Sequence, residues 1–237
     1  MIAFYYILRF HSKRVLYLLL LAGFLFPLFT LFINAFTLKP EPLLILDASI
    51  TLFGVLTFLF SFYLGTSVFP EEIETRSIYP FLTRISRIRY LAETLLACNF
   101  LMLIFLLLLY GELSIVLFEV SGFFSTALVQ GFLVHLSQGF IWINLAILLS
   151  MFATPALNFC LCFVFIILGN TPPAILHGGL LRILRGVFPL LTLFDLKINL
   201  LENRWAPATL FAALIYNVVY GSILAILSGI SFKRKNL

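Results

Sequence analysis

The chain has 237 residues, of which 62% are apolar and 11% are charged. Soluble domains typically contain roughly 45–50% apolar and about 25% charged residues, so this composition excludes an ordinary soluble protein and favours an integral membrane protein. The formal net charge is +5, and the basic residues cluster at the ends of apolar segments. Membrane topology explains that distribution better than nucleic-acid binding does.

Apolar segments of about 20 residues are long enough to cross a bilayer as helices. In chain order, six segments are predicted to do so: 15–36, 48–69, 94–118, 126–150, 155–169 and 208–230. The fifth is short and is expected to gain residues at one end. The first lacks a small-x-small cleavage site, so it is interpreted as an uncleaved span. The predicted fold is therefore an all-α integral membrane protein, with a single six-helix transmembrane domain over residues 1–237.

Two further segments are expected to lie at the membrane surface. Residues 1–14 mix aromatic and aliphatic side chains with Arg9, Lys13 and Arg14, which is typical of an interfacial helix. The long connection 170–207 has several aliphatic side chains on one helical face, and Pro189 ends this helical pattern. This pattern predicts a short re-entrant or interfacial helix before the sixth span.

The basic residues predict the orientation of the chain in the membrane. With both termini inside, ten basic residues lie on the cytoplasmic side: Arg9, Lys13, Arg14, Arg76, Arg84, Arg87, Arg89, Lys233, Arg234 and Lys235. Five lie on the other side: Lys39, Arg182, Arg185, Lys197 and Arg204. Because positive charge concentrates in cytoplasmic loops, the prediction is a multi-pass inner (plasma) membrane protein with both termini and the loop 70–93 in the cytoplasm.

The loop 70–93 is the longest charged segment of the chain, with acids first and bases last. It opens with Pro70 and three glutamates, and Pro70 suits the start of a helix whose positive amino end would favour those acids. Pro80 argues against one unbroken helix. The predicted form is a short helix, a break, and a second basic piece that returns to the membrane.

The loop contains Glu72-Ile-Glu-x-Arg-Ser-Ile-Tyr-Pro-x-Leu, followed by Arg84 and Ser86-Arg87. This order resembles the cytoplasmic loop of bacterial ABC transporter permease subunits, of the small six-span exporter kind (type-two, ABCG-like). The run 188–196 and the basic terminus 232–237 extend the resemblance along the chain. Two departures are Ile85, where a proline is usual, and Glu93-Thr94, which replace the Gly-Lys that commonly opens the third span.

The resemblance implies a permease that couples to a separate ATPase. Its cytoplasmic coupling helix would sit in a groove of an ABC ATPase subunit, which would bind ATP and Mg, alongside a second permease chain, the same or similar. The residues expected to carry this coupling are Glu71, Glu72, Glu74, Arg76, Ser77, Tyr79, Arg84 and Arg87. The chain itself has no Gly-x-x-x-x-Gly-Lys-[Ser/Thr] loop, so it is expected to be no enzyme and to hold no cofactor, catalytic group or metal of its own.

Polar residues inside the predicted spans are candidates for a substrate pathway: His135, Gln138, Asn217 and Tyr220. Hydrogen bonding between helices of the bundle explains them equally well. Small residues also recur at helix-packing spacing. Two such sets are expected to pack against helices of the same subunit more often than against a second subunit. They are the face with Gly54, Thr57, Ser61 and Gly65 and the stripe with Gly221, Ala225 and Gly229.

Two alternatives to a general ABC exporter stay open. The first is the permease of a specialised export system for cytochrome maturation or cofactor assembly. The second, from a different class, is a non-transporting membrane scaffold or channel without a motor. Co-purification of an ATPase in stoichiometric amount would separate the motor-driven permeases from the second alternative. The sequence does not identify the transported substrate.

Overall fold

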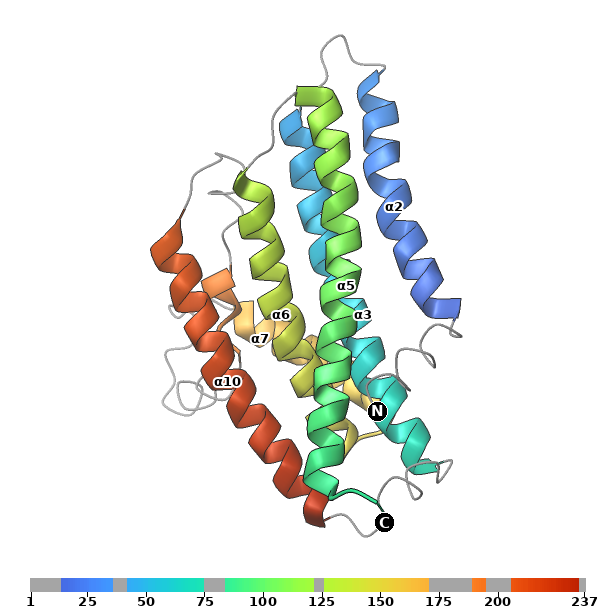
Figure 1. The fold of residues 1–237 in the computed structure, drawn as a ribbon, viewed down its shortest axis with the longest axis vertical. Coiled ribbons are helices and arrows are strands. Elements are labelled where there is room, and N and C mark those ends of the chain that lie inside the picture. Colours follow the sequence, from blue (N-terminus) through green and yellow to red (C-terminus); the bar gives the residue numbers. More distant parts are fainter. Residues whose placement is uncertain are drawn as a thin grey trace.

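The computed structural model describes residues 14–35, 42–74, 84–121, 126–170, 189–194 and 206–234. These residues form helices and no strand, as the all-α prediction requires (Figure 1). The helices are α2 (Arg14–Ala35), α3 (Pro42–Glu74), α5 (Arg87–Ser121), α6 (Thr126–Ser150), α7 (Pro155–Asn170) and α10 (Pro207–Arg234), with a short 3₁₀ helix, η2 (Leu191–Phe194).

Four helices contain segments long and apolar enough to cross a membrane: Leu43–Thr66, Arg87–Ser121, Leu128–Ser150 and Pro207–Arg234. They overlap the predicted second, third, fourth and sixth spans, and their length and apolar composition are those of a membrane protein. Helix α2 forms at the predicted first span. Helix α7 has 16 residues and is therefore about 24 Å long, which is shorter than the hydrocarbon core of about 30 Å. Six complete crossings remain a prediction.

Two helices extend well beyond the apolar segments that predicted them. The second span was expected to end at residue 69, but α3 continues through Pro70 to Glu74. The third was expected to begin at residue 94, but α5 begins at Arg87. Hydropathy reports how much of a helix lies in lipid, whereas the backbone stays helical wherever its hydrogen bonds continue. The charged helix ends therefore project past the apolar zone.

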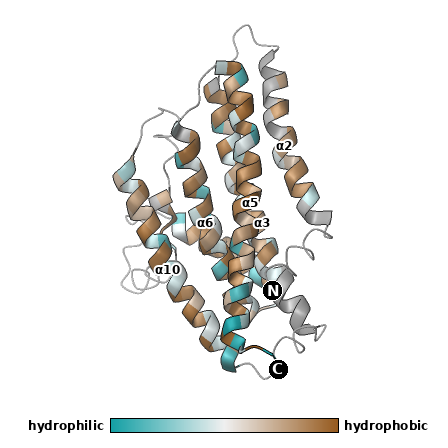
Figure 2. Cartoon of the chain, in the orientation of Figure 1, coloured by the Kyte–Doolittle hydropathy of each residue, from teal (hydrophilic) through white to brown (hydrophobic). Residues whose placement is uncertain are grey.

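The charged helix ends gather at one end of the bundle. In Figure 1 α3 ends, α5 begins and α10 ends toward the lower part of the molecule, and Figure 2 shows hydrophilic residues at the lower ends of α5 and α10. The Arg87 guanidinium donates a hydrogen bond of 3.2 Å to the carbonyl of Lys233. The start of α5 and the end of α10 are thus on the same side, which agrees with an even number of passes between them.

Helix α6 lies at the centre of the bundle and packs most closely on α3. The Ser61 hydroxyl is fully buried and lies 3.3 Å from the carbonyl oxygen of Gly139, across the two helices. One turn further along α3, Gly65 lies against Ala146: a Cβ added to Gly65 would be 3.2 Å from the Ala146 carbonyl carbon. The predicted small-residue face of α3 therefore packs inside the chain, because its small side chains let the two backbones approach closely.

Part of the connection 170–207 is buried against the bundle. The Tyr216 hydroxyl on α10 accepts a hydrogen bond of 2.9 Å from the amide of Leu190, and Leu191 and Phe194 of η2 are 5% and 3% exposed. Irregular backbone at membrane depth is tolerated where protein surrounds it. The interfacial helix expected before Pro189 lies outside the described residues. So do residues 1–13 of the one expected over 1–14, whereas Arg14 begins α2.

Candidate functional site

The acidic end of α3 differs from the local structure that the sequence predicted. Glu71, Glu72 and Glu74 were expected to open a separate helix after Pro70, but they form the last turn of α3, and Pro70 lies inside it. These three positions are therefore in the last turn of a helix, at the negative end of its macrodipole, where an acidic residue is unfavourable. A proline within a helix removes one backbone hydrogen bond and can kink the helix without ending it, so Pro70 does not have to mark a helix start.

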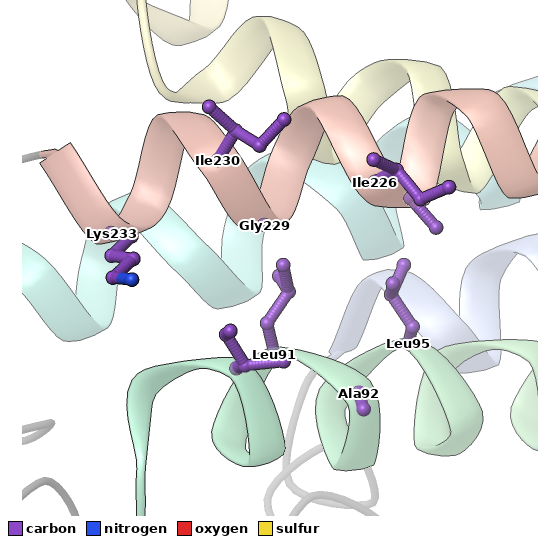
Figure 3. Close-up of a pocket in the computed structure, with 9 residues that line it drawn as sticks. Leu91, Ala92, Leu95, Ile226, Gly229, Ile230 and Lys233 are labelled. Atoms are coloured by element: carbon purple, nitrogen blue, oxygen red, sulfur yellow. The ribbon is translucent and has the colours of Figure 1, made fainter.

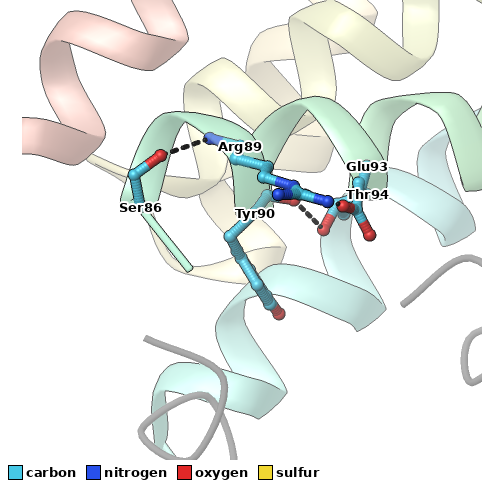
Figure 4. A network of polar contacts seen from close by, with 5 residues as sticks. All are labelled: Ser86, Arg89, Tyr90, Glu93 and Thr94. Carbon is cyan, nitrogen blue, oxygen red and sulfur yellow. Dashed lines mark hydrogen bonds and ion pairs between the residues drawn. The ribbon is translucent and has the colours of Figure 1, made fainter. Parts of the chain in front are cut away.

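Helix α5 begins at a serine cap that the sequence reasoning missed. The amide of Arg89 donates a hydrogen bond of 3.3 Å to the Ser86 hydroxyl (Figure 4). The amide of Tyr90 donates one of 2.9 Å to the Ser86 carbonyl. Both contacts are typical of a helix N-cap. The third helical position holds arginine where the usual capping box has Glu or Gln. The sequence therefore has the serine of a capping box but not its acidic or amide partner.

Two arginines occupy the first turn of α5, at the positive end of its macrodipole. Arg89 donates a hydrogen bond of 3.0 Å from Nε to Glu93, one turn along (Figure 4). Arg87 bonds the Lys233 carbonyl at the end of α10. A cation at this position weakens a helix by roughly 0.3–1 kcal/mol. The end of α3 thus has acidic residues and the start of α5 has basic ones, and in both places the helix macrodipole disfavours that charge.

The coupling residues predicted from sequence are described only in part. Arg84 is exposed in the turn before α5, and Arg87 is half-buried at its start. The backbone of Glu71, Glu72 and Glu74 belongs to α3, while their side chains lie outside the described residues. Arg76, Ser77 and Tyr79 are also outside them, so the predicted coupling helix and its contacts remain a prediction.

His135 lies at a junction of three helices. Its Nδ1 shares a hydrogen bond of 2.7 Å with the Tyr110 hydroxyl on α5, and both side chains are buried. Two glycines make room for this pair. A Cβ added to Gly54 on α3 would lie 3.4 Å from His135 Nε2, and one added to Gly131 on α6 would lie 2.9 Å from the Tyr110 hydroxyl. The pair links α5 to α6 against the surface of α3.

The other pathway candidates lie elsewhere on α6 and α10. Gln138 is half-buried on α6, one turn beyond His135. Asn217 is 7% exposed on α10, and its Oδ1 has no hydrogen-bond partner among the described residues. Tyr220 stacks on Tyr216 with ring centroids 5.5 Å apart. The four residues therefore lie on two helices, with His135 and Gln138 on α6 and Asn217 and Tyr220 on α10.

Several buried polar residues were not selected from the sequence. Tyr110 follows a run of leucines and was not recognised as the partner of His135. Asn158 on α7 is fully buried and donates a hydrogen bond of 2.9 Å to the carbonyl of Ala146 near the end of α6. Its Oδ1 lies 3.4 Å from the Cys162 thiol. A polar residue at the start of a short apolar helix was the available signal for this contact.

No family model matches this chain, and a search of curated proteins finds no matching relative. The functional reading therefore depends on the charges at the helix ends, the packing of the bundle and the resemblance of the loop.

Proposed function

We propose that this chain is the membrane-spanning subunit of an ATP-driven exporter, and that the loop 70–93 couples it to a separate ATPase. The observation that carries the proposal is the charge at the loop's two flanks. Acids at the end of α3 and arginines at the start of α5 both oppose the local helix dipole. Helix stability does not account for charges in these places. The positive-inside rule accounts for the arginines alone, whereas recognition of a charged partner surface would account for both signs.

The packing at this end of the bundle suits the transmission of movement. The rings of Tyr90 on α5 and Phe232 on α10 have centroids 6.2 Å apart, and each side chain is fully buried. Helix α5 is continuous over 35 residues, which is about 52 Å. A displacement of the loop would therefore move α5 as one body together with the end of α10, as alternating access in a helical bundle requires.

Purification tests the coupling directly. The wild-type chain is expected to bring down an ATPase subunit in stoichiometric amount. The double reversal Glu72→Lys, Glu74→Lys is expected to lower that recovery by about tenfold or more, because opposite charges at an interface become like charges. Glu119→Lys reverses an exposed acid at the opposite end of α5 and serves as the matched control. Full recovery of ATPase and transport with the double reversal would contradict the proposed coupling.

Cysteine labelling tests the orientation on which this coupling depends. In a background with Cys98, Cys160 and Cys162 replaced by alanine, Glu74→Cys is expected to react only with a membrane-permeant thiol reagent. Glu119→Cys, at the far end of the bundle, is expected to react with an impermeant reagent added outside intact cells. Outside labelling at position 74 would place the charged loop away from any cytoplasmic ATPase and would overturn the proposal.

The motor-free scaffold remains the second candidate because of one observation. Buried hydroxyls such as Thr57, Ser61 and Thr94 bond to carbonyls four residues earlier in their own helices, and His135 bonds to Tyr110. Polar groups satisfied in this way favour stable packing over a conducting path. Purification without any ATPase, under conditions in which the wild-type chain is folded, would favour the scaffold.

A further inference from the structure

An apolar groove runs between α5 and α10 at the charged end of the bundle. Its volume is about 450 Å³, and it is lined by Leu91 and Leu95 from α5 and by Ile226, Gly229 and Ile230 from α10 (Figure 3). That volume lies within the range of about 300–1,000 Å³ that is usual for small-molecule sites. Gly229 keeps the groove open, because no described atom would lie within 4 Å of a Cβ added there.

Positive charge lies at one end of this groove. Lys233 is among its lining residues, and in Figure 3 its side chain extends from α10 toward the α5 side. Arg234 follows it and is exposed. Among the described residues, no carboxylate pairs with Lys233 or Arg234, and Glu93 is engaged by Arg89. The site therefore combines an apolar groove with a positively charged mouth, the end next to Lys233. This mouth lies where the charged ends of α5 and α10 begin.

We propose that this groove binds one anionic phospholipid of the inner leaflet. An acyl chain would lie along Leu91, Leu95 and Ile226, and the phosphate would bind Lys233 and Arg234. Basic pockets between transmembrane helices on the cytoplasmic side are the usual sites for anionic headgroups. The hydrogen bond from Arg87 to the Lys233 carbonyl holds the two helices together at this mouth, so the site is formed before the lipid arrives.

Charge argues against two other occupants. A second copy of this chain docking symmetrically would bring one Lys233 and Arg234 pair toward another, and like charges across an interface are unfavourable. The segment 1–13 carries Arg9 and Lys13, so it would also bring positive charge to a positive mouth. A lipid phosphate supplies the opposite charge together with the apolar chain. This inference does not depend on the proposed export function.

Native mass spectrometry of the detergent-purified full chain tests the proposal, with phosphatidylglycerol and phosphatidylcholine as probes. The wild-type chain is expected to retain one phosphatidylglycerol at least tenfold more strongly than phosphatidylcholine. Gly229→Leu fills the groove and is expected to abolish this preference. Lys233→Gln with Arg234→Gln is expected to reduce phosphatidylglycerol binding by about tenfold, whereas Lys233→Arg preserves the charge and is expected to keep it.

A matched control separates groove filling from general damage. Gly111→Leu introduces the same side chain at another open helical glycine, on the outer half of α5, and is expected to bind phosphatidylglycerol as the wild type does. Equal binding of the two lipids by the wild-type chain, or unchanged binding by Gly229→Leu, would overturn the proposal. A dimer that Gly229→Leu converts to monomer would assign the groove to a second copy and would also overturn it.

Discussion

Gly65→Leu is expected to destabilise the bundle by about 3 kcal/mol, as measured by unfolding of the purified protein in detergent. At this position α3 lies directly against the backbone of α6, and an added Cβ would be 3.2 Å from both the carbonyl carbon of Ala146 and the amide nitrogen of Ile147. Overpacking typically costs about 1–3 kcal/mol. The cost is at the upper end here because helix backbone cannot rotate away as a flexible side chain can.

Gly111→Leu provides the control for this prediction. It makes the same change in another membrane helix, where nothing in the described structure lies within 4 Å of the new Cβ. Leucine has the higher helix propensity, by roughly 0.8–1 kcal/mol in soluble helices, so this variant is expected to be at least as stable as the wild type. If both leucine variants unfolded alike, the close contact between α3 and α6 would be wrong.

The helices could be predicted from sequence because their apolar segments are long and separated by polar ones. The fourth predicted span, 126–150, coincides with α6, and the face of α3 containing Thr57 and Ser61 packs inward as its small residues indicated. Both predictions use information that is local to one helix: hydropathy over about 20 residues, and side-chain size at helical spacing.

The extensions of α3 and α5 could not be predicted in this way. Pro70 is an ambiguous signal, since proline occurs both at helix starts and near helix ends. Ser86 is a cap without the acidic partner that usually identifies one. The true boundaries depend on backbone hydrogen bonds outside the membrane, which hydropathy does not report. The positions of the glutamates relative to the helix dipole therefore came from the structure alone.

Only one residue of the buried pair between His135 and Tyr110 could be predicted from the sequence. His135 was recognised because a polar side chain in an apolar segment is conspicuous. Its partner was not, because Tyr110 belongs to another helix 25 residues away and resembles the many aromatic residues that face lipid. Which two helices meet, and at what height, is a property of the packed bundle. The predicted coupling residues 76–79 lie outside the described residues.

His135→Ala is expected to destabilise the protein by about 2–4 kcal/mol. The substitution leaves a cavity at the junction of α3, α5 and α6, and it removes the buried partner of the Tyr110 hydroxyl. Tyr110→Phe loses the hydrogen bond but keeps the ring, so its cost is expected to be about 1 kcal/mol. The double variant is expected to cost less than the sum of the two single changes, with a coupling energy of about 1 kcal/mol.

The same variants distinguish packing from substrate contact at His135. If the imidazole only supports the bundle, transport is expected to fall in proportion to the loss of folded protein, for His135→Ala and Tyr110→Phe alike. If the imidazole contacts the substrate, His135→Ala or Gln138→Ala is expected to lower the transport activity per amount of folded protein, while the ATPase still co-purifies. Tyr110→Phe leaves the imidazole in place and is then expected to transport normally. We expect the first pattern for His135, because its Nδ1 is already bonded and its ring is 6% exposed. A transport defect in fully stable His135→Ala would contradict this.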